Sequence, residues 1–157
     1  MKRHIFLLFA LTSAGFSVVA ETVPCPALST LAQVGACPSE EELRFTFDGY
    51  CSDNGRAYDK PEKQICTDFA LYRAMKDVAL WETSDGRFSG YVNCDPGKSG
   101  LAGAIPNGLR IDKQGSVTRM TCTYSSGVAF TYRSKAQCVA ETVACASNPG
   151  ACVATCE

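Results

Sequence analysis

The side chains that could carry out chemistry in this chain are almost all carboxylates. The single histidine of the 157 residues is His4, and it lies within residues 1–20, which have the pattern of a cleaved leader. Without it, the chain has no Ser–His or Cys–His nucleophilic pair and no histidine metal ligand. Glycosidases need only two Asp or Glu side chains, so paired carboxylates are the one catalytic class left open. Glu82 and Asp85 are the candidate catalytic pair, and they predict, as the alternative function, a small secreted hydrolase acting on a glycan.

Most of the acidic residues have a simpler structural reason for their position. Asp53, Asp85 and Asp95 stand beside Asn-Gly, Gly or Pro-Gly, where aspartate is a common turn former. Asp59, followed three residues later by Glu62, is typical of the start of a helix. Because no catalytic motif is recognisable, the sequence favours a non-enzyme that uses no cofactor and no metal.

The segment over residues 95–108 is the feature most typical of a binding site. It holds four Gly and two Pro in fourteen residues, which predicts a long loop, and long loops in small domains are commonly functional. Its middle is apolar, with Leu101 and Ile105, and Lys98 and Arg110 flank it. We therefore expect Lys98, Leu101, Ile105 and Arg110 to form a loop that binds a partner. The alternative is that Leu101 and Ile105 pack back onto the sheet.

The ten cysteines predict a disulfide framework. Their number is even, and the absence of Cys-x-x-Cys excludes the usual spacings of redox dithiols and zinc knuckles. The sequence does not fix which cysteines pair, and a cysteine-only metal site at Cys145, Cys152 and Cys156 is the alternative for those three. A disulfide framework further predicts irreversible unfolding under reductant. The cysteines are Cys25, Cys37, Cys51, Cys66, Cys94, Cys122, Cys138, Cys145, Cys152 and Cys156.

The N-terminus predicts export to an oxidising compartment. Lys2 and Arg3 precede an apolar run over residues 5–16, and a signal peptidase could cleave after Ala20. Residues 21–157 would then form a single disulfide-rich domain with 13 Lys and Arg against 16 Asp and Glu. This mildly acidic balance argues against nucleic acid, and no second apolar run is long enough to span a membrane. We expect a secreted or periplasmic protein.

One short segment is similar to the centre of a Kazal-type protease inhibitor. The segment is Cys51-x3-Gly55-x2-Tyr58 followed by Cys66, and it covers about sixteen residues. It has four more residues than the Kazal pattern between Tyr58 and Cys66, and no correctly spaced cysteine precedes Cys51. The similarity therefore does not assign the chain to that family.

The elements that must position these residues are predicted from the spacing of apolar side chains. Apolar residues alternate over 43–47, which predicts a strand, although Ser39 with Glu42 resembles a helix-capping box. Apolar side chains three or four residues apart predict the clearest helix over 60–78. We expect an α+β fold, with an antiparallel sheet of four to six strands and two or three helices packed on one face. Further helices are predicted over 26–34 and 134–146, and further strands over 80–83, 88–94, 109–112, 117–124 and 128–133.

The aromatic residues allow two interpretations. Trp81, Tyr91, Tyr124 and Tyr132 lie on or near predicted hairpins, where a solvent-facing row could stack on sugar rings or anchor a protein partner. The alternative places the phenylalanines in the core and the tyrosines at its edge, and the small size of the domain favours it. Those phenylalanines are Phe45, Phe69, Phe88 and Phe130.

Together these patterns predict an exported, disulfide-stabilised binding protein, such as an inhibitor or an immunity-type module. Its partner would be another extracytoplasmic protein or a glycan. A structural or adhesive surface protein is a further alternative, which differs by predicting self-association instead of one-to-one capture.

Overall fold

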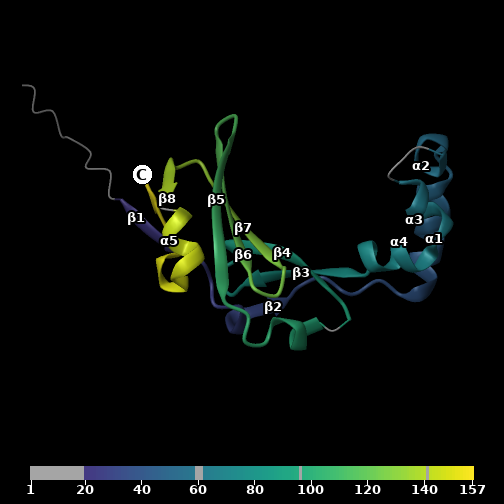
Figure 1. Cartoon of the computed structure of the whole chain (residues 1–157), viewed down its shortest axis with the longest axis horizontal. Coiled ribbons are helices and arrows are strands. Elements are labelled where there is room, and N and C mark those ends of the chain that lie inside the picture. Colours follow the sequence, from purple (N-terminus) through teal and green to yellow (C-terminus); the bar gives the residue numbers. More distant parts are fainter. Residues whose placement is uncertain (1–19, 59–61, 96, 141) are drawn as a thin grey trace, which may run out of the picture.

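The computed structural model describes residues 20–58, 62–95, 97–140 and 142–157. Residues 1–19 of the predicted leader and the predicted helix cap at Asp59 lie outside these ranges. Within the described part of the chain, nine strands form two antiparallel sheets and are accompanied by five α-helices (Figure 1). The predicted α+β class is therefore confirmed.

The larger sheet contains six strands. They are β2 (Leu31–Gln33), β3 (Val78–Thr83), β4 (Phe88–Asn93), β5 (Pro106–Gln114), β6 (Val117–Tyr124) and β7 (Ala129–Ser134). Their order across the sheet is β2-β3-β4-β7-β6-β5. The predicted strands over 80–83 and 88–94 therefore form a hairpin, and those over 109–112, 117–124 and 128–133 form a meander. The reversals contain Gly86, Gly115 and Gly127, which have the positive φ values that tight hairpin turns require.

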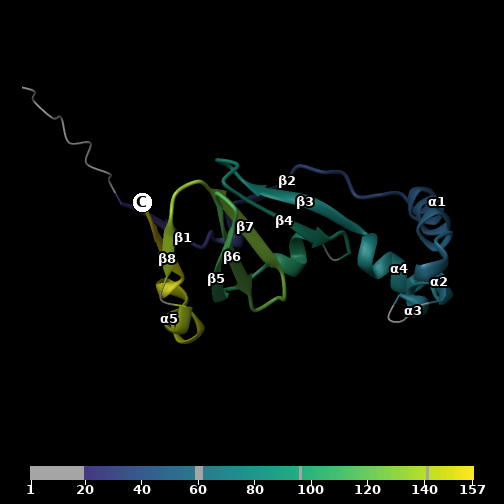
Figure 2. The same ribbon diagram turned by 90° about the horizontal axis from the view of Figure 1, so that it is seen from above.

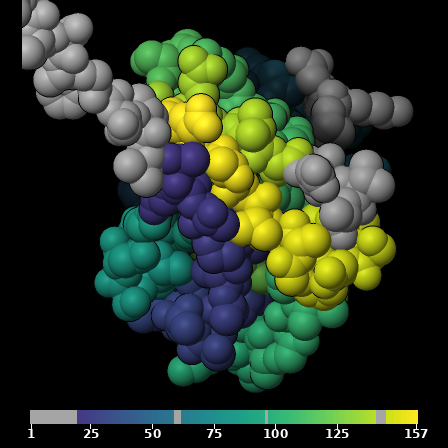
Figure 3. Space-filling view, turned by 90° about the vertical axis from the view of Figure 1, so that its left-hand side faces the viewer, coloured from purple at the N-terminus to yellow at the C-terminus, as the bar shows by residue number. Residues whose placement is uncertain are grey.

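The smaller sheet joins the two ends of the described chain. Its strands are β1 (Glu21–Pro24), β8 (Cys138–Ala140) and β9 (Val153–Cys156), in the order β1-β9-β8. Figure 3 shows the purple N-terminal strand beside the yellow C-terminal one. The predicted helix over 134–146 is wrong in its first half, because Cys138 pairs with Cys156 across the sheet and is disulfide-bonded to it. Only α5 (Thr142–Ser147) is helical there, and η3 (Pro149–Ala151) follows it.

One hydrophobic core includes residues of both sheets. Phe88 and Phe130 of the larger sheet are buried in it, as predicted, together with Val23 of β1. Tyr124 is also buried, and its hydroxyl donates a 2.6 Å hydrogen bond to the carbonyl of Pro26. Burial raises the pKa of Tyr124, so this phenol stays neutral and serves as a structural donor.

Four helices pack on one another at the end of the molecule away from the smaller sheet (Figures 1 and 2). They are α1 (Glu40–Cys51), α2 (Asn54–Tyr58), α3 (Lys63–Thr67) and α4 (Phe69–Lys76). We expected the helices to be stacked on a face of the sheet, and α5 does lie against β5. The aromatic side chains of α1 and α4 instead contact each other, so each of these two helices covers the apolar face of the other.

The predicted strand over 43–47 is wrong, because these residues lie in α1. The capping box is real: the Ser39 N–H donates to Glu42 Oε2 at 2.7 Å, and the Glu42 N–H donates to Ser39 Oγ at 3.2 Å. Leu43 is buried on the inner side of the helix. Phe45, predicted to be a core residue, is two positions further on and is 79% exposed.

The predicted helix over 26–34 is reduced to the single turn η1 (Leu28–Thr30). The residues after η1 pair with β3 as strand β2, and this non-local pairing overrides the local helical pattern. Gly35, which follows the segment predicted to be this helix, lies close to the backbone of β3. A Cβ atom at Gly35 would stand 3.1 Å from the backbone nitrogen of Leu80, closer than an ordinary van der Waals contact.

The long helix predicted over 60–78 is interrupted at Asp68. This residue has an extended backbone, and its side chain accepts a 2.9 Å hydrogen bond from the N–H of Ala70. Asp68 is therefore the N-cap of α4, and α3 ends before it.

All ten cysteines are paired, so the predicted disulfide framework is confirmed. Cys145, Cys152 and Cys156 are consumed in disulfides and cannot form the alternative thiolate metal site. Among the described residues, no helix is both long enough and apolar enough to cross a membrane. The disulfides are Cys25–Cys122, Cys37–Cys94, Cys51–Cys66, Cys138–Cys156 and Cys145–Cys152.

Candidate functional site

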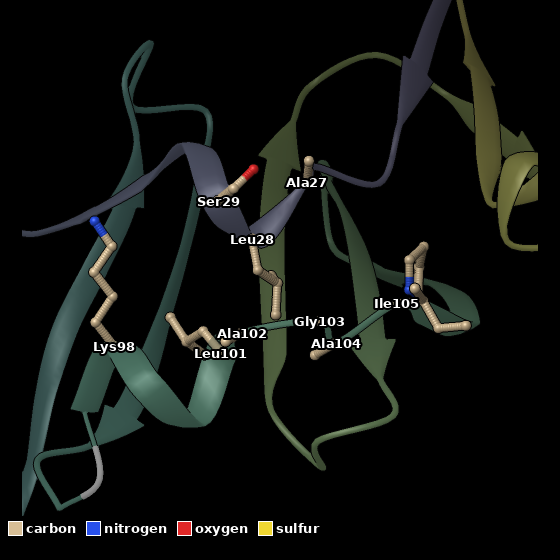
Figure 4. A pocket seen from close by; sticks show the side chains of 10 residues that line it. Ala27, Leu28, Ser29, Lys98, Leu101, Ala102, Gly103, Ala104 and Ile105 are labelled. Carbon is tan, nitrogen blue, oxygen red and sulfur yellow. The ribbon is translucent and has the colours of Figure 1, made fainter.

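A half-open pocket of about 570 Å³ lies between η1 and the predicted binding loop (Figure 4). The loop forms η2 (Gly97–Leu101) and then the turn that leads into β5. Residues 27–29 line one side of the pocket, and Lys98 with residues 101–106 lines the other. Apart from Ser29 and Lys98, every lining residue is apolar or glycine. The pocket therefore offers an apolar surface with one hydroxyl and one ammonium group.

Three of the four predicted loop residues meet at this pocket. Lys98, Leu101 and Ile105 all line it. Leu101 is only 4% exposed and belongs to the hydrophobic core, whereas Ile105 is 53% exposed. Arg110 lies further along, on β5, and its guanidinium forms a 3.0 Å ion pair with Asp112. Leu101 thus packs back onto the sheet, and Ile105 remains available to a partner.

The backbone around Ile105 is held by hydrogen bonds. The N–H of Ile105 donates to Ser125 Oγ at 3.2 Å, and the N–H of Ser125 donates to the Ile105 carbonyl at 3.0 Å. The N–H of Ala104 donates to the Leu101 carbonyl at 3.3 Å, and Gly103 supplies the positive φ of this turn. These bonds tie the loop to the β6–β7 turn, so Ile105 projects from a fixed backbone.

The charge at the pocket is unbalanced. Lys98 is exposed, and none of the described residues places a carboxylate within ion-pair distance of its ammonium group. Ser29, across the pocket, is also exposed. A ligand group with an apolar body and a nearby anionic group would match this combination.

The two candidate carboxylates, Glu82 and Asp85, lie at the β3–β4 hairpin. Asp85 lies in the turn between β3 and β4, where it accepts hydrogen bonds from Thr83 Oγ1 at 2.6 Å and from the Arg87 N–H at 3.1 Å. The bond from Thr83, reinforced by that from Arg87, lowers the pKa of Asp85, whereas a general acid needs a raised pKa. Glu82 lies on β3, opposite Ser89 of β4. Asp85 therefore has the role of a turn former.

The aromatic residues do not form one solvent-facing row. Trp81 and Tyr124 are buried, whereas Tyr91 is exposed. Tyr132 is half-buried, and its hydroxyl accepts a 3.3 Å hydrogen bond from Arg87.

Residues 27–29 of the pocket were not predicted as site residues. Their sequence, Ala-Leu-Ser, lies in the segment over 26–34 for which a helix is predicted, and it carries no signal of binding. Their position opposite Lys98 depends on the pairing of β2 with β3, which local periodicity does not reveal.

Within the described ranges, no group of three or more Cys, His, Asp or Glu side chains is placed to hold a metal ion. Compared with protein-family profiles, curated proteins and solved structures, the chain shows no significant match. The residues of the pocket and the leader-like N-terminus are therefore the features of this chain that bear on its function.

Proposed function

We propose that this chain is an exported binding protein that holds an apolar segment of another extracytoplasmic protein in the pocket between η1 and the loop. The leader-like residues 1–20 support export. The five disulfides are compatible with an oxidising compartment.

The observation that carries the proposal is the chemistry of the pocket. An apolar cavity of about 570 Å³ can accept one or two side chains of a partner, and apolar surfaces of this kind are typical of interaction sites. The exposed Ile105 adds an aliphatic contact at the pocket, and the ammonium of Lys98 favours a partner with a carboxylate beside its apolar anchor.

The scaffold also fits the task of presenting a binding surface. Leu101 anchors the loop in the core, and the hydrogen bonds between Ile105 and Ser125 fix its outer part. A loop that is ordered before binding loses little conformational entropy when a partner docks. Asp85, one of the two carboxylates of the hydrolase alternative, is occupied by the hydrogen bonds of its turn.

Site-specific photocrosslinking in the producing cell tests the proposal. A benzophenone amino acid at position 105 should capture one protein from the extracytoplasmic fraction. The same probe at Val139, which is 71% exposed on β8, should not capture it.

Binding of the captured protein should then fall about tenfold for Ile105→Ser and for Lys98→Glu, without a lower melting temperature. Val139→Ser is the matched control, because it removes an exposed aliphatic side chain elsewhere. Leu101→Ser is unsuitable as a test, because it would destabilise the core. Equal capture at positions 105 and 139, or unchanged binding by both loop variants, would overturn the proposal.

A further inference from the structure

The outward face of strands β5, β6 and β7 carries an unusual set of side chains. Leu109, Met120 and Phe130 of these strands point into the core. Because successive side chains of a strand alternate between faces, their neighbours along each strand lie on the opposite face. Two rows cross the strands on that face, and we call them the arginine face. One row is Arg110, Thr121, Thr131, Ser89 and Glu82, and the other is Asp112, Arg119 and Arg133.

The arginine face has three guanidinium groups and two carboxylates, those of Asp112 and Glu82. Asp112 Oδ2 contacts Arg119 Nη2 at 3.2 Å and Arg110 Nη2 at 3.0 Å. Arg133 is exposed and has no ion-pair partner among the described residues. Asp112 is thus shared by two arginines, and neither Glu82 nor Arg133 forms an ion pair among the described residues.

Arg119 and Arg133 are direct partners in the register of β6 and β7. Like charges directly opposite each other on neighbouring strands destabilise a sheet. In addition, Arg119 Nε is the one buried side-chain nitrogen or oxygen of the described residues that lacks a hydrogen-bond partner. Both features are unfavourable in the isolated chain, and an anion accepting hydrogen bonds from the Nη groups of these two arginines would relieve the like-charge pair.

We propose that the arginine face binds an anionic polysaccharide through carboxylate groups carried on its sugar units. Guanidinium groups bind carboxylates in a bidentate manner, and the hydroxyls of Ser89, Thr121 and Thr131 can exchange hydrogen bonds with sugar hydroxyls. The two rows contain no aromatic or large aliphatic side chain to anchor a protein partner at their centre. The proposal involves different residues from the pocket and does not depend on the function proposed for it.

Calorimetric titration of the full disulfide-bonded chain tests this assignment. The probes are a hexamer of galacturonic acid, a neutral hexamer of glucose and hexaglutamate. The galacturonate hexamer should bind, and the neutral hexamer should not. Arg133→Ala should weaken galacturonate binding at least tenfold, and Arg133→Lys should recover only part of it, because lysine keeps the charge and loses the planar fork.

Two controls separate binding from folding. Lys113→Ala removes one positive charge from β5, on the opposite face from Arg110 and Asp112, and should leave binding unchanged. The melting temperature of Arg133→Ala should not fall, since the substitution removes a like-charge pair. A lack of galacturonate binding at millimolar concentration would overturn the proposal. Equal loss for Lys113→Ala and Arg133→Ala would also overturn it, as would hexaglutamate binding as tightly as galacturonate.

Discussion

The sheet body and the helical tip of the molecule are stabilised by different kinds of contact. The sheet body consists of the two sheets with α5, and the helical tip consists of helices α1 to α4. In the body, the Cys25–Cys122 disulfide joins residues 97 positions apart. In the tip, the Cys51–Cys66 disulfide joins residues only 15 positions apart. The body thus depends on distant parts of the chain, and the tip is built from one continuous stretch.

The interior of the tip is made of aromatic rings. Phe47 packs against Phe69 and Tyr72, with ring centroids 5.4 Å and 5.2 Å apart. The guanidinium of Arg44 lies 4.5 Å from the centre of the Phe69 ring, so a cation covers one side of this cluster. Such a cluster compensates for the small number of fully buried residues in these short helices.

The tip is attached to the body at a short junction. The Cys37–Cys94 disulfide closes it, and the N–H of Cys94 donates a 2.9 Å hydrogen bond to the carbonyl of Asp77. The side chain of Asp77 is nearly buried and forms a 3.1 Å ion pair with Arg73 of α4. We therefore expect substitutions within the tip to lower the stability of the body less than substitutions within the body itself.

Removing the Cys25–Cys122 disulfide should produce the largest difference in stability between the body and the tip. On the loop-entropy model, a link of this length contributes about 4–5 kcal/mol, against about 3 kcal/mol for the short Cys51–Cys66 loop. The double substitution Cys25→Ser/Cys122→Ser should therefore lower the stability of the body strongly, and Cys51→Ser/Cys66→Ser should loosen the tip alone. Guanidinium unfolding followed by the fluorescence of Trp81, the single tryptophan and a buried residue of β3, reports on the body. Equal shifts of the Trp81 midpoint in both variants would contradict the comparison.

Truncating one phenylalanine in each region should give the next largest difference, measured as the loss of unfolding free energy. Phe130 is fully buried in the body, so Phe130→Ala should cost about 3–5 kcal/mol of unfolding free energy. Phe45 is 79% exposed on α1, so Phe45→Ala should change stability by no more than about 0.5 kcal/mol. Thermal unfolding by circular dichroism measures both. A loss above about 2 kcal/mol for Phe45→Ala would mean that this ring is packed in solution.

The sheet body and the helical tip also differ in how well their elements could be predicted from the sequence. The meander of β5, β6 and β7 was predictable because alternating residues and turn glycines such as Gly115 and Gly127 are local signals. In the tip, residues 43–47 alternate like a strand, yet Leu43 and Phe47 are also one helical turn apart. The capping box of α1 settles that ambiguity in favour of the helix.

The candidate pocket was predictable only in part, for a related reason. The composition of residues 95–108 indicates an unusual loop, and Lys98 and Ile105 do line the pocket. Contacts between distant segments bury Leu101 and place residues 27–29 on the opposite side of the pocket. These contacts are not visible in the local sequence. β8 was missed for the same reason, because it is formed by the pairing of Cys138 in β8 with Cys156 in β9, which local periodicity does not reveal.

The smallest expected difference between the two regions is their response to acid. The Ser39 N–H donates a hydrogen bond to the Glu42 carboxylate, and this bond lowers the pKa of Glu42 below its usual 4.5. A carboxyl with a depressed pKa in the folded state contributes stability above its unfolded pKa, and this contribution is lost as the pH falls through the folded value. Helix α1 should therefore weaken as the pH is lowered below 4.5.

Glu42→Gln is the matched substitution, because glutamine can still accept the hydrogen bond from Ser39 but does not titrate. The helical circular dichroism signal of this variant should be less sensitive to acid than that of the unmodified chain. Its Trp81 fluorescence should keep the original acid transition, since Asp85 in the body retains its own lowered pKa through the Thr83 hydroxyl. If Glu42→Gln shifted the Trp81 transition as much as the helical signal, the tip and the body would unfold as one unit, and the proposed separation between them would be wrong.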